Sequence, residues 1–172
     1  MSTETCGWIV ISFCVIEMVN KVLTVATGEK WVGYGVRSFS WLIKEIMNCA
    51  EKELVMTVYV ISDMNIVKNI ENALEKRIPV EIFVYLPDPA HRTGAAAEIF
   101  RLKDEYTYLT THMIRNKILH AKVLVADGRN ILVGSANPTS GGMVKNYELG
   151  LLVEDGTIAQ KILTMLRRLI VE

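Results

Sequence analysis

The feature that most constrains the fold is an alternation, in the middle of the chain, of short apolar runs with segments of helical periodicity. Residues 54–61 (LVMTVYVI) are apolar and rich in β-branched side chains, which is typical of a buried strand. Asp63 can cap a helix after this run. The apolar positions of that helix recur every three or four residues: Ile66, Val67, Ile70 and Leu74. Residues 80–86, after Pro79, have the composition of another buried strand.

Strands that alternate with helices of about ten residues need crossover connections, which make neighbouring strands parallel. The sequence therefore predicts an α/β fold with a mixed, largely parallel sheet and helices on both of its faces. Further elements follow from the same two patterns. We expect helices over 38–50, 95–103 and 157–171, and strands over 106–111, 118–126, 130–133 and 148–153.

The length and charge of the chain limit the kinds of protein it can be. Its 172 residues are enough for one ordinary domain, and a composition that is 51% hydrophobic argues against disorder. Lys and Arg together number 19, as do Asp and Glu, so the chain has no global field that would draw it to nucleic acid or anionic membranes. A polyanionic ligand must therefore be held by a local patch of positive charge.

Residues 1–35 differ in composition from the rest of the chain. Residues 8–25 begin with an almost continuous apolar run, and the glycine-punctuated stretch 28–35 has the composition of a connector. Residues 1–7 contain one Glu and neither Lys nor Arg, unlike the start of a secretory signal. We expect a buried or dimer-forming helix over 8–25, with a membrane anchor as the alternative, and a main domain over 36–172.

The three cysteines, Cys6, Cys14 and Cys49, are odd in number and not closely paired in sequence. This pattern indicates neither a disulfide framework nor a zinc site. A reducing compartment fits it best, and we expect a cytoplasmic protein. The alternative is association with a membrane through residues 8–25.

The most specific pattern in the chain starts at His120-Ala-Lys122 and runs to Asn137 as HxKx4Dx6GSxN. Residues two apart on a strand share a face, so His120 and Lys122 should project together from the expected strand 118–126. Ser135 and Asn137 are also two apart. Their hydroxyl and amide groups can join Lys122 in holding phosphate oxygens.

His120 is the candidate nucleophile. A neutral imidazole attacks without help, whereas a serine hydroxyl needs a separate base to remove its proton. A carboxylate then has to hold the second ring nitrogen. Glu148 is the candidate for this role, and its separation from His120 in sequence permits contact without requiring it. Asp127 is the second candidate carboxylate, or else a hairpin residue that bonds its own turn.

These residues together resemble the HKD signature of the phospholipase D superfamily. The shared positions are His120, Lys122, Asp127, Gly134, Ser135 and Asn137, with Glu148 where single-motif nucleases of the superfamily place their histidine-orienting acid. The resemblance implies one HKD domain per chain, no metal or other cofactor, and a phosphohistidine intermediate. The histidine of a second motif would protonate the leaving oxygen. Because this sequence has one such motif, the resemblance implies a homodimer with a shared site.

The resemblance leaves three functions open. The chain looks most like a nuclease that hydrolyses DNA or RNA phosphodiester bonds as a homodimer and without metal. A phospholipase or phosphatidyl transferase acting on membrane lipids would use the same chemistry, but it would need an apolar entry beside His120. A non-catalytic DNA-binding module is the third hypothesis, although the intact His120, Lys122 and Asn137 argue against it.

Two further sets of residues are candidates for nucleic-acid contact. Cations that flank the motif can form a local patch for a phosphate backbone, or can simply keep the surface soluble. They are Arg115, Lys117, Arg129 and Lys145. Aromatic side chains can stack on unpaired bases or pack in a core or interface, and packing is the commoner use. They are Trp31, Tyr34, Trp41 and Tyr147.

Overall fold

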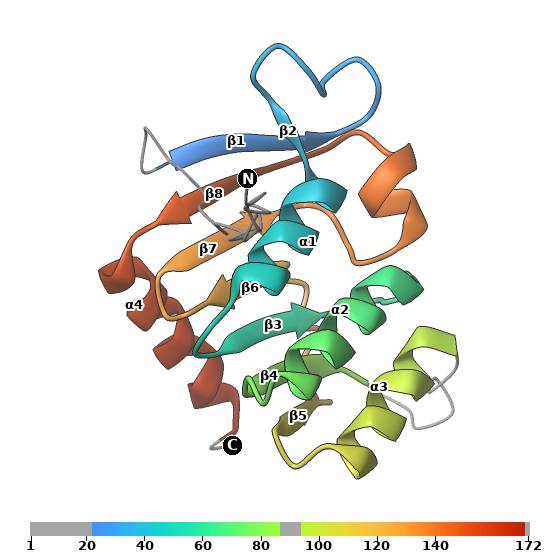
Figure 1. Ribbon diagram of the computed structural model, residues 1–172, viewed down its shortest axis with the longest axis vertical. Helices are drawn as coiled ribbons and strands as arrows, with labels where there is room; N and C mark the ends of the chain where they lie inside the picture. Colours follow the sequence, from blue (N-terminus) through green and yellow to red (C-terminus); the bar gives the residue numbers. More distant parts are fainter. Residues whose placement is uncertain (1–21, 87–93, 171–172) are drawn as a thin grey trace, which may run out of the picture.

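One mixed sheet of eight strands organises the chain in the computed structural model, which describes residues 22–86 and 94–170 (Figure 1). The strand order is β2-β1-β8-β7-β6-β3-β4-β5. The strands are β1 (Val22–Thr27), β2 (Arg37–Ser38), β3 (Leu54–Val58), β4 (Val80–Tyr85), β5 (Leu109–Ile114), β6 (Val123–Ala126), β7 (Asn130–Gly134) and β8 (Glu148–Glu154). The helices are α1 (Phe39–Cys49), α2 (Met64–Glu75), α3 (Gly94–Glu105), the π-helical turn η2 (Gly141–Lys145), α4 (Gly156–Arg167) and the 3-10 turn η3 (Arg168–Ile170).

The sheet is mixed, as expected, but it is less parallel than the sequence suggested. Within the described residues, the pairs β1–β2, β3–β4 and β4–β5 are parallel. The pairs β1–β8, β8–β7, β7–β6 and β6–β3 are antiparallel. The crossover helices α2 and α3 make one half parallel, whereas a tight hairpin through Asp127 and Gly128, both with positive φ, turns the chain back in the other half.

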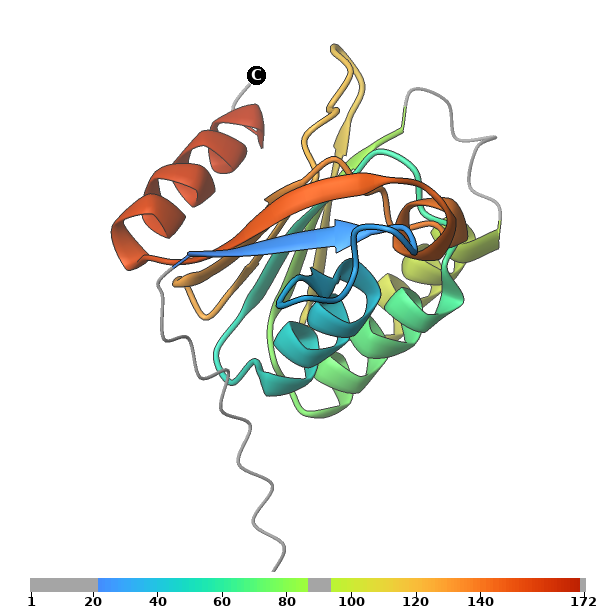
Figure 2. The same cartoon turned by 90° about the horizontal axis from the view of Figure 1, so that it is seen from above.

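Helices cover both faces of the sheet, which confirms that part of the expected fold. Helices α1, α2 and α3 pack on one face and α4 packs on the other (Figure 2). The larger core lies under the three helices, around Leu42, Ile70 and Leu102. The smaller core lies under α4, where Leu163 meets Phe83 and Val125.

The helix starts follow from side chains that satisfy the first free backbone N–H groups. Ser38 Oγ accepts from Trp41 N at 3.3 Å, and Asp63 Oδ1 accepts from Asn65 N at 2.9 Å. Asp155 Oδ1 accepts from the N–H groups of Thr157 and Ile158 at 2.8 and 2.9 Å. The cap expected at Asp63 is therefore confirmed, and the caps at Ser38 and Asp63 fix where α1 and α2 begin.

Residues 22–25 contradict the expected N-terminal helix, because they belong to β1. The β-branched and small residues of VLTVAT pair along their whole length with β8, so the sheet of the main domain includes residues before position 36. Residues 1–21, which carry the rest of the expected helix, lie outside the described residues. No helix in the described part of the chain is both long and apolar enough to span a bilayer.

The cysteine pattern did not indicate a disulfide framework, whereas Cys49 is disulfide-bonded. The other two cysteines lie outside the described ranges. An odd number of cysteines argues against a complete framework of bridges, but it does not exclude a single one.

The strand directions gather particular strand ends at one edge of the sheet. The carboxyl ends of β1, β3, β4, β5 and β7 lie at this edge, beside the amino ends of β6 and β8. Side chains just before β6, just after β7 and at the start of β8 therefore meet, although they are far apart in sequence. We call this edge the site edge.

Asp127 lies at the opposite edge, where β6 ends. Its Oδ1 accepts from the N–H groups of Glu51, Lys52 and Glu53 at 3.1, 2.7 and 3.2 Å, and its Oδ2 accepts from Glu51 N at 3.2 Å. The carboxylate thus holds the loop between α1 and β3 against the hairpin. This position supports the alternative role considered for Asp127, a structural residue of the hairpin.

Replacing Asp127 should therefore weaken the fold. Asp127→Ala removes a charged acceptor of backbone hydrogen bonds and puts alanine at a φ of 56°, and we expect the free energy of unfolding to fall by about 2 kcal/mol. Asp127→Asn should lose less, because asparagine tolerates this backbone conformation. Urea unfolding measures both, with the exposed Asp104→Ala as control. An unchanged midpoint for Asp127→Ala would contradict the structural role.

Candidate functional site

His120 and Lys122 lie at the site edge, just before β6 rather than within it. The expected strand 118–126 starts in fact at Val123. The His120 side chain is exposed, and its ring meets the Tyr59 ring edge-on with centroids 4.8 Å apart. Lys122 Nζ lies 5.4 Å from the centroid of the same Tyr59 ring and donates to the His120 carbonyl oxygen at 2.7 Å. Tyr59 is therefore the surface on which both side chains are arranged.

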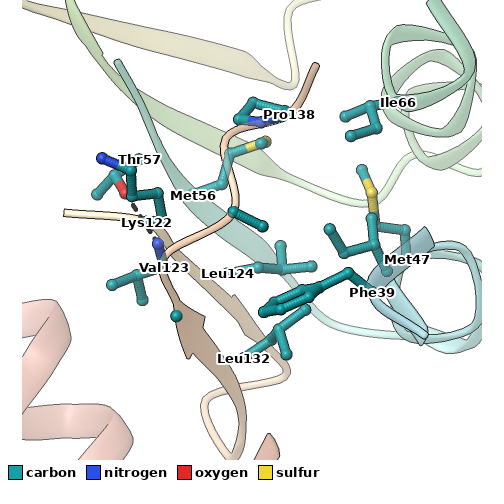
Figure 3. A pocket seen from close by; sticks show the side chains of 13 residues that line it. Phe39, Met47, Met56, Thr57, Ile66, Lys122, Val123, Leu124, Leu132 and Pro138 are labelled. Atoms are coloured by element: carbon teal, nitrogen blue, oxygen red, sulfur yellow. Dashed lines mark hydrogen bonds between the residues drawn. The ribbon is translucent and has the colours of Figure 1, made fainter. Parts of the chain in front are cut away.

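A buried threonine on β3 holds the segment that carries these two residues. Regular pairing of β3 with β6 ends at Met56 and Leu124. Beyond it, Thr57 Oγ1 donates to the Ala121 carbonyl at 2.6 Å and accepts from Val123 N at 3.0 Å, a bond drawn in Figure 3. One hydroxyl thus replaces the strand pairing at the point where the chain turns out of the sheet.

Ser135 and Glu148 meet at the same edge, from the end of β7 and the start of β8. The Ser135 hydroxyl donates to Glu148 Oε2 and accepts from Leu149 N at 3.1 Å. Asn146 Nδ2 donates to Glu148 Oε1 at 3.0 Å. Both carboxylate oxygens are therefore held within one chain, and neither receives a hydrogen bond from His120.

The pKa of Lys122 is lowered from its ordinary value because the side chain is desolvated. The nearby Glu148 carboxylate opposes this shift, since it favours the charged ammonium. The desolvation comes from the apolar residues that surround the side chain. The Lys122 stem lines a small, mostly apolar pocket of ≈ 40 Å³ together with Phe39, Leu124 and Leu132 (Figure 3).

Asn137 lies in the loop after β7, and its backbone is closely confined. Pro138 O accepts from Ser62 N and Asp63 N at 3.0 and 3.2 Å, which ties the loop to the start of α2. Gly142 packs against the other side, where a Cβ atom would lie 2.3 Å from Asn137 O. Within the described residues, Asn137 Oδ1 is buried and has no hydrogen-bond partner. An unmatched buried acceptor of this kind lowers the stability of the fold, so its presence calls for an explanation such as a role in function.

Gly134 in the same motif serves close packing. It pairs with Gly150 across β7 and β8, and the Phe39 ring lies over both. A Cβ atom would stand 2.7 Å from Phe39 Cζ at Gly134 and 2.5 Å from it at Gly150. The two glycines therefore let α1 approach the sheet directly beneath the site.

The structure brings together five of the six residues that the sequence singled out for chemistry or phosphate contact. His120, Lys122, Ser135, Asn137 and Glu148 belong to segments that reach the site edge. Asp127 does not, because it lies at the other end of β6.

The four candidate cations divide in the same way. Arg115 and Lys117 are exposed in the connection from β5 to His120, and Lys145 is exposed in η2 near Glu148. Arg129 follows Asp127 at the opposite edge and pairs with Glu154. Three of the four cations can therefore reach a ligand at the site edge.

Sequence reasoning missed Thr57, Tyr59 and Tyr85. The signal for Thr57 was a polar residue in the otherwise apolar run 54–58, and it is only 3% exposed. Tyr59 and Tyr85 each stand at the carboxyl end of a parallel strand, where binding sites of α/β folds gather. Within residues 22–86 and 94–170, no group of three or more His, Cys, Asp or Glu side chains is arranged to hold a metal ion.

Comparison with known proteins agrees with this fold. The family model described as "Cardiolipin synthase, PLD-like domain" matches residues 42–170. DISARM protein DrmC of Bacillus paralicheniformis is 28% identical over 139 residues, which cover 78% of this chain and 57% of that protein. This chain thus matches little more than half the length of that relative.

Two solved structures show the same fold. The phospholipase D family member Nuc from Salmonella typhimurium superposes with a TM-score of 0.71 at 19% identity, over 86% of this chain and 91% of that one. NucT from Helicobacter pylori gives a TM-score of 0.64 at 18% identity, over 74% of this chain and 84% of that one.

The electrostatics of the site can be tested by titrating Lys122. We expect its pKa to lie below the ordinary lysine value, and Glu148→Gln to lower it further because the carboxylate that favours the ammonium is gone. NMR of 13Cε-labelled lysine measures both values, and Lys122→Arg assigns the signal by its loss. A Lys122 pKa at the ordinary value, or one that rises in Glu148→Gln, would contradict the described environment.

Proposed function

The chain belongs to the phospholipase D-like family, and from this premise we propose that it is a metal-independent nuclease in which His120 forms a phosphohistidine intermediate. The observation that carries the proposal is the meeting at one sheet edge of an exposed imidazole with the ammonium, hydroxyl and amide groups that a phosphate needs. These groups come from Lys122, Ser135 and Asn137.

The proposed reaction starts with attack on phosphorus. The free imidazole nitrogen of His120 forms a P–N bond, and the bond from phosphorus to the leaving oxygen breaks on the opposite side. Lys122 offsets the charge on the equatorial oxygens, which would otherwise be the task of a metal ion. Ser135 and Asn137 position those oxygens through hydrogen bonds. The unmatched Asn137 carboxamide oxygen fits a substrate or a partner group that donates to it.

The second half of the reaction restores the enzyme. A second histidine gives its proton to the leaving oxygen in the first step and then takes a proton from water. The resulting hydroxide attacks phosphorus and breaks the P–N bond, which frees His120 and releases the phosphate monoester. We assign the second histidine to another copy of His120 in a homodimer, because this sequence carries one HKD motif.

Glu148 is proposed to orient His120 when the dimer and substrate are in place. Its carboxylate lies close enough to Lys122 to affect that residue's pKa. It accepts hydrogen bonds from Ser135 and Asn146 within the chain, and each of its oxygens keeps a further lone pair that can accept from His120.

Nucleic acid is the proposed substrate because three exposed cations gather on segments that reach the site edge. Arg115 and Lys117 precede His120, and Lys145 precedes Glu148. A local patch can bind a phosphate backbone although the whole chain has zero net charge. Phosphatidyl transfer on membrane lipids is the second candidate, favoured by a largely apolar cavity of ≈ 650 Å³ whose lining includes Tyr59, the neighbour of His120.

Cleavage of a mixture of single- and double-stranded DNA in excess EDTA tests the proposal. We expect the wild-type protein to cut under these conditions, and His120→Ala to be slower by at least about a thousandfold because the nucleophile is gone. His112→Gln is the matched control. His112 Nε2 lies 2.9 Å from Glu81 Oε1, and the same Glu81 carboxylate forms an ion pair with Arg167 at the end of α4.

Three results would count against the proposal. Full inhibition by EDTA would indicate a metal-dependent reaction, and cleavage retained by His120→Ala would remove the nucleophile. Sedimentation of a fully active monomer would remove the shared site. Turnover of phospholipid vesicles in place of DNA would favour the second candidate.

A further inference from the structure

Two stacked tyrosines lie beside His120, the proposed nucleophile. Tyr59 and Tyr85 stack with centroids 5.6 Å apart and an interplanar angle of 23°. They stand at the carboxyl ends of β3 and β4 and line the same cavity of ≈ 650 Å³. Tyr59 also contacts His120 and has Lys122 over its ring, so this one side chain lies between the cavity and the proposed phosphate site. No residue that we assigned to catalysis lines it.

A second aromatic pair stands on the other side of the phosphate site. Trp31, in the loop after β1, meets Tyr147, just before β8, with ring centroids 5.0 Å apart. The two side chains are 46% and 47% exposed, so this pair is not part of the core. A hydrogen bond of 3.0 Å from the Tyr147 hydroxyl to Glu29 Oε1 holds the loop against the start of β8.

The strand order puts the two pairs on opposite sides of the motif. Along the site edge, the loop with Trp31 follows β1 and Tyr147 directly precedes β8. Next along the edge are Ser135, which follows β7, and Lys122, which precedes β6. Tyr59 and Tyr85, at the ends of β3 and β4, come last. From β1 to β4 there are five strand spacings, each about 4.8 Å wide. A phosphate at Lys122 therefore has an aromatic pair to each side along the sheet edge.

Exposed cations accompany the second pair. Lys30 precedes Trp31 directly, and Lys145 lies two residues before Tyr147. A backbone phosphate next to a base on this pair would thus have two lysines nearby, against the one carboxylate of Glu29 that the Tyr147 hydroxyl bonds. This combination of a cationic track with separate aromatic faces is how single strands are bound without sequence preference.

We propose that the two pairs are base-binding subsites, and that the substrate is single-stranded nucleic acid with one unpaired base at the Tyr59–Tyr85 cavity and another on Trp31–Tyr147. The proposal rests on the proposed phosphodiesterase function and names its substrate. Bases inside a duplex have both faces covered by their neighbours, so they cannot reach two separated aromatic surfaces. An acyl chain would fill the cavity but would leave the second aromatic pair without a base to stack on it.

Binding by the His120→Ala protein tests the subsites without relying on turnover. Two fluorescent single-stranded oligonucleotides of equal length are compared by anisotropy, one with bases and one with an abasic backbone of the same charge. We expect the base-bearing strand to bind more tightly than the abasic strand. The Kd of the abasic strand divided by the Kd of the base-bearing strand measures the contribution of the bases. This ratio should fall at least about fivefold when His120→Ala is combined with Tyr85→Leu or with Trp31→Ala.

Tyr108→Leu provides the matched control. Tyr108 is 42% exposed but stands just before β5, at the opposite edge of the sheet, so this substitution should leave the ratio unchanged. Sedimentation and thermal unfolding of each variant separate a lost subsite from a lost dimer or fold. Tyr85→Phe, which keeps an aromatic face, should keep the ratio.

Four outcomes would overturn the subsites. Two are equal affinity for the base-bearing and abasic strands, and equal affinity for duplex and single strand. The other two are displacement of the base-bearing strand by anionic phospholipid vesicles, and loss of the dimer in Trp31→Ala. None of these requires cleavage. By contrast, a wild-type protein that binds base-bearing strands preferentially but cuts nothing in EDTA would disprove the nuclease mechanism and leave the subsites standing.

Discussion

The position of the candidate site depends on one buried hydroxyl. Thr57 bonds the backbone on both sides of Lys122, through Ala121 O and Val123 N, where strand pairing between β3 and β6 has ended. Two backbone groups that lose their strand partner are therefore satisfied where the chain leaves the sheet, and His120 is exposed while Val123 and Leu124 continue into the strand. In this segment the His120 ring and the Lys122 ammonium both lie beside Tyr59.

The electrostatics of the site follow from what surrounds the lysine. The apolar pocket that Lys122 lines disfavours its charge and the Glu148 carboxylate favours it, and the pKa of Lys122 is lowered because the desolvation is the larger of the two effects. Hydrogen bonds from a poorly hydrated cation to phosphate lose less to competing water. The paired glycines under Phe39 make this environment dense, because α1 lies directly on β7 and β8.

The sequence predicted the elements better than it predicted the geometry between them. The apolar periods located α1 and α2, with Asp63 as the expected cap of α2. The spacing of the motif singled out His120 and Lys122 as candidates, and the resemblance to a known family added Glu148. The sequence could not show that β6 begins at Val123, because that depends on a threonine from another strand. Nor could it separate the two roles of Asp127, since the loop that its carboxylate holds lies more than 70 residues away. Long-range contacts of this kind have no local pattern.

The most direct measurement of the central claim is the chemical identity of the covalent intermediate. A DNA strand labelled at the scissile phosphate is mixed with excess enzyme in EDTA, quenched during turnover with alkaline denaturant, and the digested protein is analysed by mass spectrometry. The mechanism predicts a phosphoryl-linked adduct on the peptide that contains His120, through a ring nitrogen, and its absence in His120→Ala. Label on another residue, or turnover without any adduct, would contradict it.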